Sequence, residues 1–274
     1  MLKVSLYFLI ICAAVFFFSS CKKTIDFIRE HPDAYRTPCR ITNYRVVAIN
    51  GVYSNYVVTY NNMGNPVNMM DSDRVNPIGT DQYFRYDKLN RLSDYMSAYA
   101  PNLGAIEWHK YVYQKPGYII DTAMYYETGD VRGPSPIAKN TTEYSIFAYT
   151  MDELDRIVKI WSIPIDSPHT PSLKNIFIYD ANGNLPLPDT SLVYDNKVNF
   201  FRTNQVWQFI YKNYSRSNLI LRDGSFAPQY NDFGLPLIRP NLERWYIYPF
   251  NQWNYSEEAF VDYSCSITKE PVYY

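Results

Sequence analysis

The side chains that most often carry out chemistry are few in this sequence and far apart. The three histidines, His31, His109 and His169, include no pair with the His-x-x-x-His spacing of a zinc site. The chain also has no Cys-x-x-Cys pair, no Gly-x-Ser-x-Gly nucleophile turn and no glycine pattern for binding nucleotide phosphates. We therefore predict no metal site and no cofactor, and the residues do not point to a particular reaction.

Acidic residues occur in two close groups, and each has an ordinary explanation. Asp152-Glu153-Leu154-Asp155 could ligate calcium, but it lacks the ligand spacing and the glycine of an EF-hand, so we interpret it as a solvated turn. Glu257 and Glu258 suggest paired glycosidase carboxylates, but adjacent strand residues point to opposite faces and would not flank one bond. His109 and Asp121 lie in predicted strands and are interpreted as structural. A hydrolase with an unrecognised site stays open as one alternative.

Residues 1–20 have the layout of an export signal. Lys3 gives a positive start, and Val4 to Phe18 is a mostly apolar run, shorter than the ~20 residues that a membrane-spanning helix needs. Small residues then precede Cys21, an order that resembles a lipoprotein signal, in which cleavage occurs just before a cysteine that carries lipid. We expect Cys21 to carry fatty acids such as palmitate, because two acyl chains make membrane attachment stable. A plain secretory signal and an uncleaved anchor are the alternatives.

This layout divides the chain into a signal peptide (1–20), a lipid anchor with its tether (21–38) and one β-rich domain (39–274). The domain is long enough to bury a single substantial core. We expect an exported protein held to the outer membrane, with neither the periplasmic nor the surface face favoured. The 26 basic and 27 acidic residues nearly balance, so charge gives no reason to expect nucleic acid or anionic lipid as a partner.

Two cysteines remain once Cys12 is removed with the signal and Cys21 is acylated. Cys39 precedes the first predicted strand, and Cys265 lies in the last one. Disulfides persist in oxidising compartments, so this pair could join the two ends of the domain if the sheet curls until its ends meet. Two unpaired buried thiols are the alternative, because cysteine is among the most buried residue types.

The elements that must position these residues are strands with aromatic side chains on both faces. A flat sheet with one buried face would alternate more cleanly. We therefore predict an all-β fold, a curved or closed antiparallel β-meander built from repeated hairpins, with long loops packed over part of its outer face. At most one short helix is expected, over 204–212, because Val206, Trp207 and Ile210 would share a face. The main predicted strands are 80–87, 91–99, 105–114, 118–127, 142–149, 156–163, 173–179, 244–250 and 259–268.

One turn pattern recurs between these strands: a tyrosine, then Asp or Asn, then Gly or Asn three residues later. The clearest copy is Tyr179-Asp180-Ala181-Asn182-Gly183-Asn184-Leu185; 60–66, 86–92 and 230–236 repeat its spacing, and 149–157 looks like a copy lengthened by two residues. Asp or Asn can bond the backbone two residues on, and Gly or Asn tolerates positive φ. We expect Gly183 to have positive φ in a hairpin loop. Ordinary hairpin turns are the alternative to a family repeat.

The turn pattern resembles the YD (Rhs-type) repeat, in which Tyr-Asp is followed by Gly and then by Arg or Asn plus Leu. A second block, 194–200 with Val206-Trp207-Gln208-Phe209 and Asn213-Tyr214-Ser215, is similar to one in uncharacterised lipoproteins of Bacteroidetes-type bacteria. Gly234-Leu235-Pro236 matches a further feature of those proteins. The resemblance covers most of the mature chain and implies an all-β exported lipoprotein, with no established activity.

Aromatic residues make up 18% of the chain, and sheet packing is the simplest account of them. The sequence therefore favours a non-catalytic binding or structural module of the cell envelope, with a glycan or an envelope protein as its partner. A carbohydrate-binding accessory protein is the main alternative, because the densest aromatic clusters could stack sugar rings. The candidate residues for such a platform are Trp207, Trp245, Tyr246, Trp253 and Tyr255.

Overall fold

The computed structural model describes residues 39–48, 53–72, 80–99, 106–130, 137–187, 190–225, 227–239 and 256–265. Thirteen strands in these segments form one sheet, and two more form a small separate one. The large sheet contains β1 (Cys39–Ala48), β2 (Tyr53–Tyr60), β3 (Pro66–Asp71), β4 (Thr80–Tyr86), β5 (Leu92–Tyr99), β6 (Ile106–Lys115), β7 (Tyr118–Asp130), β8 (Ile137–Met151), β9 (Ile157–Ile163), β10 (Ser172–Ile176), β13 (Gln229–Tyr230), β14 (Pro236–Arg239) and β15 (Ser256–Cys265). The small sheet pairs β11 (Leu192–Val198) with β12 (Ser217–Leu221). The predicted signal peptide, the tether and the strand predicted over 244–250 lie outside the described residues.

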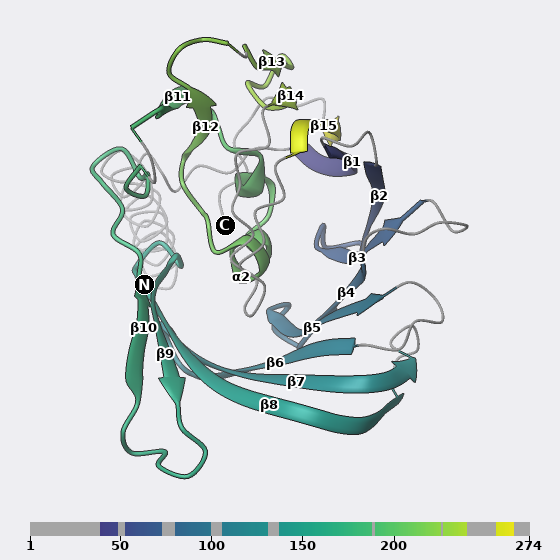
Figure 1. Ribbon diagram of the computed structural model, residues 1–274, viewed down its shortest axis with the longest axis vertical. Helices are drawn as coiled ribbons and strands as arrows, with labels where there is room; N and C mark the ends of the chain where they lie inside the picture. The colour runs from purple at the N-terminus through teal and green to yellow at the C-terminus, as the bar shows by residue number, and fades with distance from the viewer. Residues whose placement is uncertain are drawn as a thin grey trace, which may run out of the picture.

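The large sheet follows the chain from hairpin to hairpin. β1 to β10 lie side by side in order, and β15 returns to pair with β1, with β14 and β13 beyond it. Figure 1 shows the sheet bending from β10 round to β1, with β12 and α2 (Trp207–Tyr211) inside the curve. β10 and β13 are the outermost strands of this order, so the all-β antiparallel meander is confirmed in its curved and open form.

The segment between β10 and β13 fills the inside of the curve. The ring of Trp207 meets Phe84 of β4 edge-on at 5.9 Å, and Phe209 lies 5.0 Å from the ring of Tyr111 on β6. The helix predicted over 204–212 is present as α2, after the short 3-10 helix η2 (Phe200–Thr203). The prediction that loops would cover the outer face is wrong for this segment, because it packs on the aromatic residues of the inner face. None of the described helices is long and apolar enough to cross a membrane.

Five turns in the described chain share one hydrogen-bond pattern. The first residue is Asn or Asp, and its Oδ1 accepts the backbone N–H groups two and four residues later at 2.9–3.0 Å. The fourth residue has positive φ, and its N–H donates to the carbonyl of the first. The first and fourth residues are Asn61 and Gly64, Asp87 and Asn90, Asp152 and Asp155, Asp180 and Gly183, and Asn231 and Gly234.

The copy around Asp152 is not lengthened, which corrects the prediction for 149–157. Its turn has the same length as the others, five residues, and Asp155 takes the positive-φ position at 56°. Met151 stands where the other four copies have tyrosine. The Asp152 carboxylate accepts backbone N–H groups and the Arg156 side chain, so this acidic stretch is the turn that the sequence indicated.

The turn around Gly183 has a second role. Gly183 has φ 79°, as predicted, but no described strand follows the turn to complete a hairpin. Instead, Asn184 Oδ1 accepts the Ser217 N–H at 2.9 Å, and the Leu185 N–H donates to Ser215 Oγ at 3.1 Å. This turn therefore connects the end of the large sheet to the start of β12.

Two of the tyrosines just before the turns tie their hairpin to the preceding one. Tyr60 Oη donates to the Ile41 carbonyl at 2.8 Å, and Tyr86 Oη donates to the Pro66 carbonyl at 2.6 Å. The ring of each tyrosine is partly buried while its hydroxyl finds a backbone acceptor on the preceding hairpin, which is the use to which tyrosine is best suited. The tyrosine of these two turns is thus explained by a contact between hairpins.

The first and last strands of the described chain are joined covalently. Cys39 and Cys265 lie directly opposite each other in the β1–β15 pair and form a disulfide, with Cα atoms 3.9 Å apart. The pairing with β15 and the disulfide therefore hold the first described strand to a strand more than 200 positions later.

Substitution of Gly183 tests the turn geometry. Gly183→Val should lower the free energy of unfolding by more than about 1 kcal/mol, because a β-branched residue is strained at positive φ. Asn90→Gly, at the same turn position, is the matched control and should change stability by only a few tenths of a kcal/mol. Urea unfolding of both variants measures the difference, and equal stabilities would contradict the account.

Removal of the disulfide should have a large effect on stability. The bond closes a loop with a sequence separation of 226, for which the chain-entropy model gives roughly 5 kcal/mol as an upper value. Cys39→Ser combined with Cys265→Ser should lower the urea midpoint to that of the wild-type protein under reducing conditions. If dithiothreitol left the wild-type midpoint unchanged, the disulfide would not contribute to stability.

Candidate functional site

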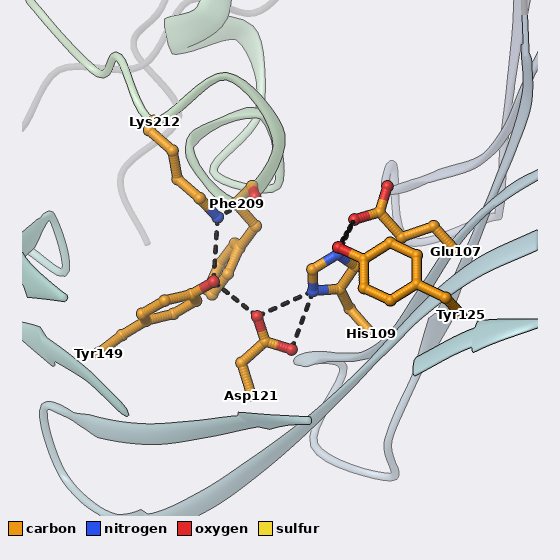
Figure 2. Close-up of polar contacts among 7 residues, drawn as sticks. All are labelled: Glu107, His109, Asp121, Tyr125, Tyr149, Phe209 and Lys212. Carbon is orange, nitrogen blue, oxygen red and sulfur yellow. Dashed lines mark hydrogen bonds and ion pairs between the residues drawn. The ribbon is translucent and has the colours of Figure 1, made fainter. Parts of the chain in front are cut away.

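A cluster of ionisable side chains lies inside the curve of the sheet, next to α2 (Figure 2). Glu107 and His109 come from β6, Asp121 from β7 and Tyr149 from β8, while Lys212 directly follows α2. Strand residues two apart share a face, and neighbouring strands bring these faces side by side. The cluster therefore joins three adjacent strands to the helical segment.

His109 lies between two carboxylates. Its Nδ1 is 2.9 Å from Asp121 Oδ2 and 3.0 Å from Oδ1, and its Nε2 is 3.0 Å from Glu107 Oε1. An ionised carboxylate only accepts hydrogen bonds, so both ring nitrogens must donate and the ring must carry both protons. Asp121 is 0% exposed, and the adjacent imidazolium compensates the charge that burial would otherwise leave isolated.

Tyr149 connects Asp121 to Lys212. Tyr149 Oη donates to Asp121 Oδ2 at 2.6 Å, and Lys212 Nζ donates to Tyr149 Oη at 3.1 Å and to the Phe209 carbonyl. The Lys212 backbone is left-handed, with φ 52°, and its N–H donates to the Gln208 carbonyl, so this residue also ends α2. With two carboxylates, one imidazolium and one ammonium, the formal charges in the cluster cancel.

The surroundings shift the pKa of both cations. Burial alone would lower the pKa of His109, but the charges and hydrogen bonds of Asp121 and Glu107 outweigh it and raise the pKa to about 9. Burial lowers the pKa of Lys212 to about 8, and Asp121 and Glu107 oppose this only in part. Burial also raises the pKa of Tyr149 well above its usual value, which keeps its phenol a neutral donor. Both cations are therefore mainly protonated at neutral pH.

The order of groups, from carboxylate through imidazole and carboxylate to phenol and amine, is one that could relay a proton. The imidazole of His109, however, occupies the space between Glu107 and Asp121 and donates to both. Two carboxylates that hold one imidazolium do not flank a substrate bond. The geometry favours a structural role, in which the cluster fastens the helical segment to the sheet.

The helical segment is also fastened at two of the turns. Gln208 Oε1 accepts the Ile157 N–H at 2.8 Å, and its Nε2 donates to the Asp155 carbonyl at 2.8 Å. Asn204 Nδ2 donates to the Gly64 carbonyl at 3.3 Å. These side-chain amides satisfy backbone groups of the β8–β9 and β2–β3 turns, so the segment spans the inside of the curve from one turn to the other.

Of the residues predicted to form a ligand platform, Trp207 belongs to the core. It is 1% exposed, and its Nε1 donates to Thr203 Oγ1 at 3.1 Å. The platform prediction is wrong at Trp207, because its ring fills the inside of the curve and presents no open face. Cys21 and the remaining platform candidates lie outside the described residues: Trp245, Tyr246, Trp253 and Tyr255.

Only part of this cluster of ionisable side chains could have been predicted from the sequence. The alternation of Glu107, His109 and Tyr111 indicates one shared strand face, but the register that sets Tyr111 opposite Asp121 is needed to bring that carboxylate beside His109. Lys212 directly follows α2, and the spacing of residues in the sequence does not predict that this segment packs on the sheet. Among the described residues, no group of three or more His, Cys, Asp or Glu side chains is placed to hold a metal ion.

Comparison with known proteins does not assign the chain to a family. No protein-family model matches the chain, and a search of curated proteins found no match. The resemblance to YD repeats and to Bacteroidetes-type lipoproteins therefore stays a prediction, and function is argued below from the residues and their contacts.

The titration of His109 tests the cluster directly. The pKa of about 9 exceeds the ordinary value of 6.5, so His109 stabilises the fold fully below about pH 6.5 and loses this contribution as the pH rises through 9. An NMR titration of the imidazole should have its midpoint near pH 9, and Asp121→Asn should lower it by at least about one unit. Tyr125→Phe, which removes only one donor to Glu107, is the control and should move the midpoint less.

Lys212 acts in the opposite direction, which is why the midpoint of His109 is the better readout than total stability. Its pKa is lowered from 10.5 to about 8, so its unfavourable contribution is present below pH 8 and is relieved as the pH rises towards 10.5. A wild-type His109 midpoint near 6.5 would show that the two carboxylates do not hold an imidazolium.

Proposed function

We propose that this protein is an exported lipoprotein of the cell envelope, anchored through lipid on Cys21, and that it acts as a non-catalytic binding or structural module. Its partner would be a glycan or another envelope protein. The observation that carries the export part of the proposal is the disulfide between Cys39 and Cys265. Such bonds persist outside the reducing cytosol, where the layout of residues 1–21 would also send the chain.

The non-catalytic part of the proposal is supported by the way the charged cluster is used. Its groups bond to one another and to the helical segment, and the resulting links hold α2 to β6, β7 and β8. Desolvation makes a buried ion cluster with cancelling charges costly in free energy, and such a cluster can select one arrangement of packed elements. We assign the cluster to that role.

A hydrolase is the second candidate, and one observation favours it: Glu107 and Asp121 converge on one histidine. For hydrolysis, His109 would have to release one carboxylate and open a space for substrate. His109→Gln would then abolish any hydrolytic activity found in a panel of chromogenic esters and glycosides. If the proposed function is right, the wild-type protein and His109→Gln will both be inactive in that panel.

Lipid attachment at Cys21 tests the proposed function. Cells grown with an alkyne-labelled fatty acid should incorporate label into the wild-type protein and not into Cys21→Ala. Cys12→Ala is the matched control and should be labelled as strongly as the wild type, because the signal peptide that carries Cys12 is removed. Equal labelling of Cys21→Ala and the wild type would contradict anchoring at this residue.

A further inference from the structure

Four hairpin turns of the meander lie along the same edge of the large sheet. In an antiparallel meander every second connection falls at the same edge. The connections β2–β3, β4–β5, β6–β7 and β8–β9 therefore form one row, and residues 177–180, which follow β10, lie at the same end of the strands beside the start of β9. We call this row the turn edge (61–65, 87–91, 115–117, 152–156 and 177–180). The loop 164–171, between β9 and β10, lies at the opposite edge.

The most exposed large hydrophobic residues of the described chain are on the turn edge. They are Leu89 at 72%, Ile178 at 66% and Met63 at 62%. Met63 and Leu89 occupy the third position of their turns, where the backbone N–H is held by the side chain of Asn61 or Asp87. Ile178 follows β10 beside the start of β9, where the Phe177 N–H donates to the Val158 carbonyl. Two fixed turns and the segment after β10 thus present apolar side chains to solvent along this edge.

The chain enters the domain at this same edge. β1 begins at Cys39, and the guanidinium of Arg40 lies against Gly64 of the β2–β3 turn and 5.6 Å from the centre of the Tyr60 ring. Cys21 is 18 residues before Cys39 (39 minus 21). An extended tether of that length reaches at most about 60 Å. A lipid on Cys21 would therefore keep the point where the chain enters the domain, at the turn edge, within that distance of the bilayer.

We propose that the turn edge docks on the lipid bilayer surface, with Leu89, Ile178 and Met63 inserted at the interface. The proposal rests on the lipid anchoring proposed above and specifies which side of the domain faces the membrane. Exposed apolar side chains gain free energy on entering the boundary between headgroups and acyl chains, and the tether raises their local concentration there.

The charges on the turn edge determine whether docking needs anionic lipid. Its exposed charged side chains are of both signs, so attraction to anionic headgroups contributes little, and docking should occur on zwitterionic phosphatidylcholine. The exposed charged residues concerned are Lys88, Arg91, Lys115, Glu153, Asp155 and Asp180.

Depth-dependent fluorescence quenching tests this orientation. The full lipidated chain carrying Leu89→Cys is labelled with a polarity-sensitive dye and reconstituted on vesicles of phosphatidylcholine with brominated acyl chains. The matched control is Ile165→Cys, 46% exposed and at the opposite edge. Cys39 and Cys265 stay unlabelled because they form the disulfide. We expect at least twofold stronger quenching at position 89 than at 165.

Second-site variants check that the apolar row is responsible. Met63→Asp combined with Ile178→Asp should reduce quenching of the Leu89→Cys label at least twofold. Val112→Asp, a substitution at a 56% exposed residue within β6 and away from the edge, should leave it unchanged.

Equal quenching at positions 89 and 165, or none at either, would overturn the docking proposal. A blue shift in the emission of the dye at position 89 that grows with protein concentration in the absence of vesicles would show that copies of the chain contact one another there. That result would also overturn the docking proposal. Co-flotation of the protein with vesicles measures membrane attachment through Cys21 independently of docking. The same labels in a Cys12→Ala, Cys21→Ala chain with vesicles in excess then decide docking even if the anchor proposal fails.

Discussion

Five turns of the described chain each depend on one side-chain oxygen. The Oδ1 of an Asn or Asp accepts two backbone N–H groups, which a tight reversal of the chain leaves without strand partners. In two turns the second carboxylate oxygen also binds an arginine, and this arginine stacks on a tyrosine of the neighbouring hairpin or segment: Arg91 on Tyr113 of β6, and Arg156 on Tyr179, which follows β10, each at 4.2 Å. One aspartate therefore fixes the turn and also the contact between adjacent hairpins.

The inside of the curve combines two kinds of interaction with different magnitudes. Aromatic rings such as Trp207 and Phe209 each bury on the order of 200 Å², which corresponds to roughly 5 kcal/mol of transfer free energy before entropy is counted. The charged cluster adds little net stability, because desolvation offsets the attraction between its groups, yet removal of one partner costs about 3–5 kcal/mol. Packing stabilises the docked helical segment, and the cluster restricts where it docks.

The local features of this fold were predictable from the sequence, and the long-range ones were only partly so. Strands such as 80–86 and 118–127 and the positive φ of Gly183 follow from alternation and turn chemistry, which act over a few residues. The short strands β3 and β12 lack that signal, since β3 begins at Pro66 and β12 has five residues. Trp207 was wrongly assigned to a ligand platform because the sequence does not show which residues pack against an indole ring, and so does not distinguish a buried tryptophan from an exposed one. The charged cluster needs the register of three strands and the docking of Lys212, neither of which any single stretch encodes.

The position of β1 between β2 and β15 has a consequence for the order in which the molecule can fold. As the chain becomes free to fold from its N-terminal end, β1 to β10 follow one another as a run of local hairpins, each able to pair with the one before it. β1 nevertheless keeps an open edge until β15 emerges, more than 200 residues later. Unpaired strand edges are templates for aggregation, and contacts of such separation form slowly. The folding chain is therefore most vulnerable to aggregation at β1 until the C-terminal part is available, and the last described strand is the one that protects the first.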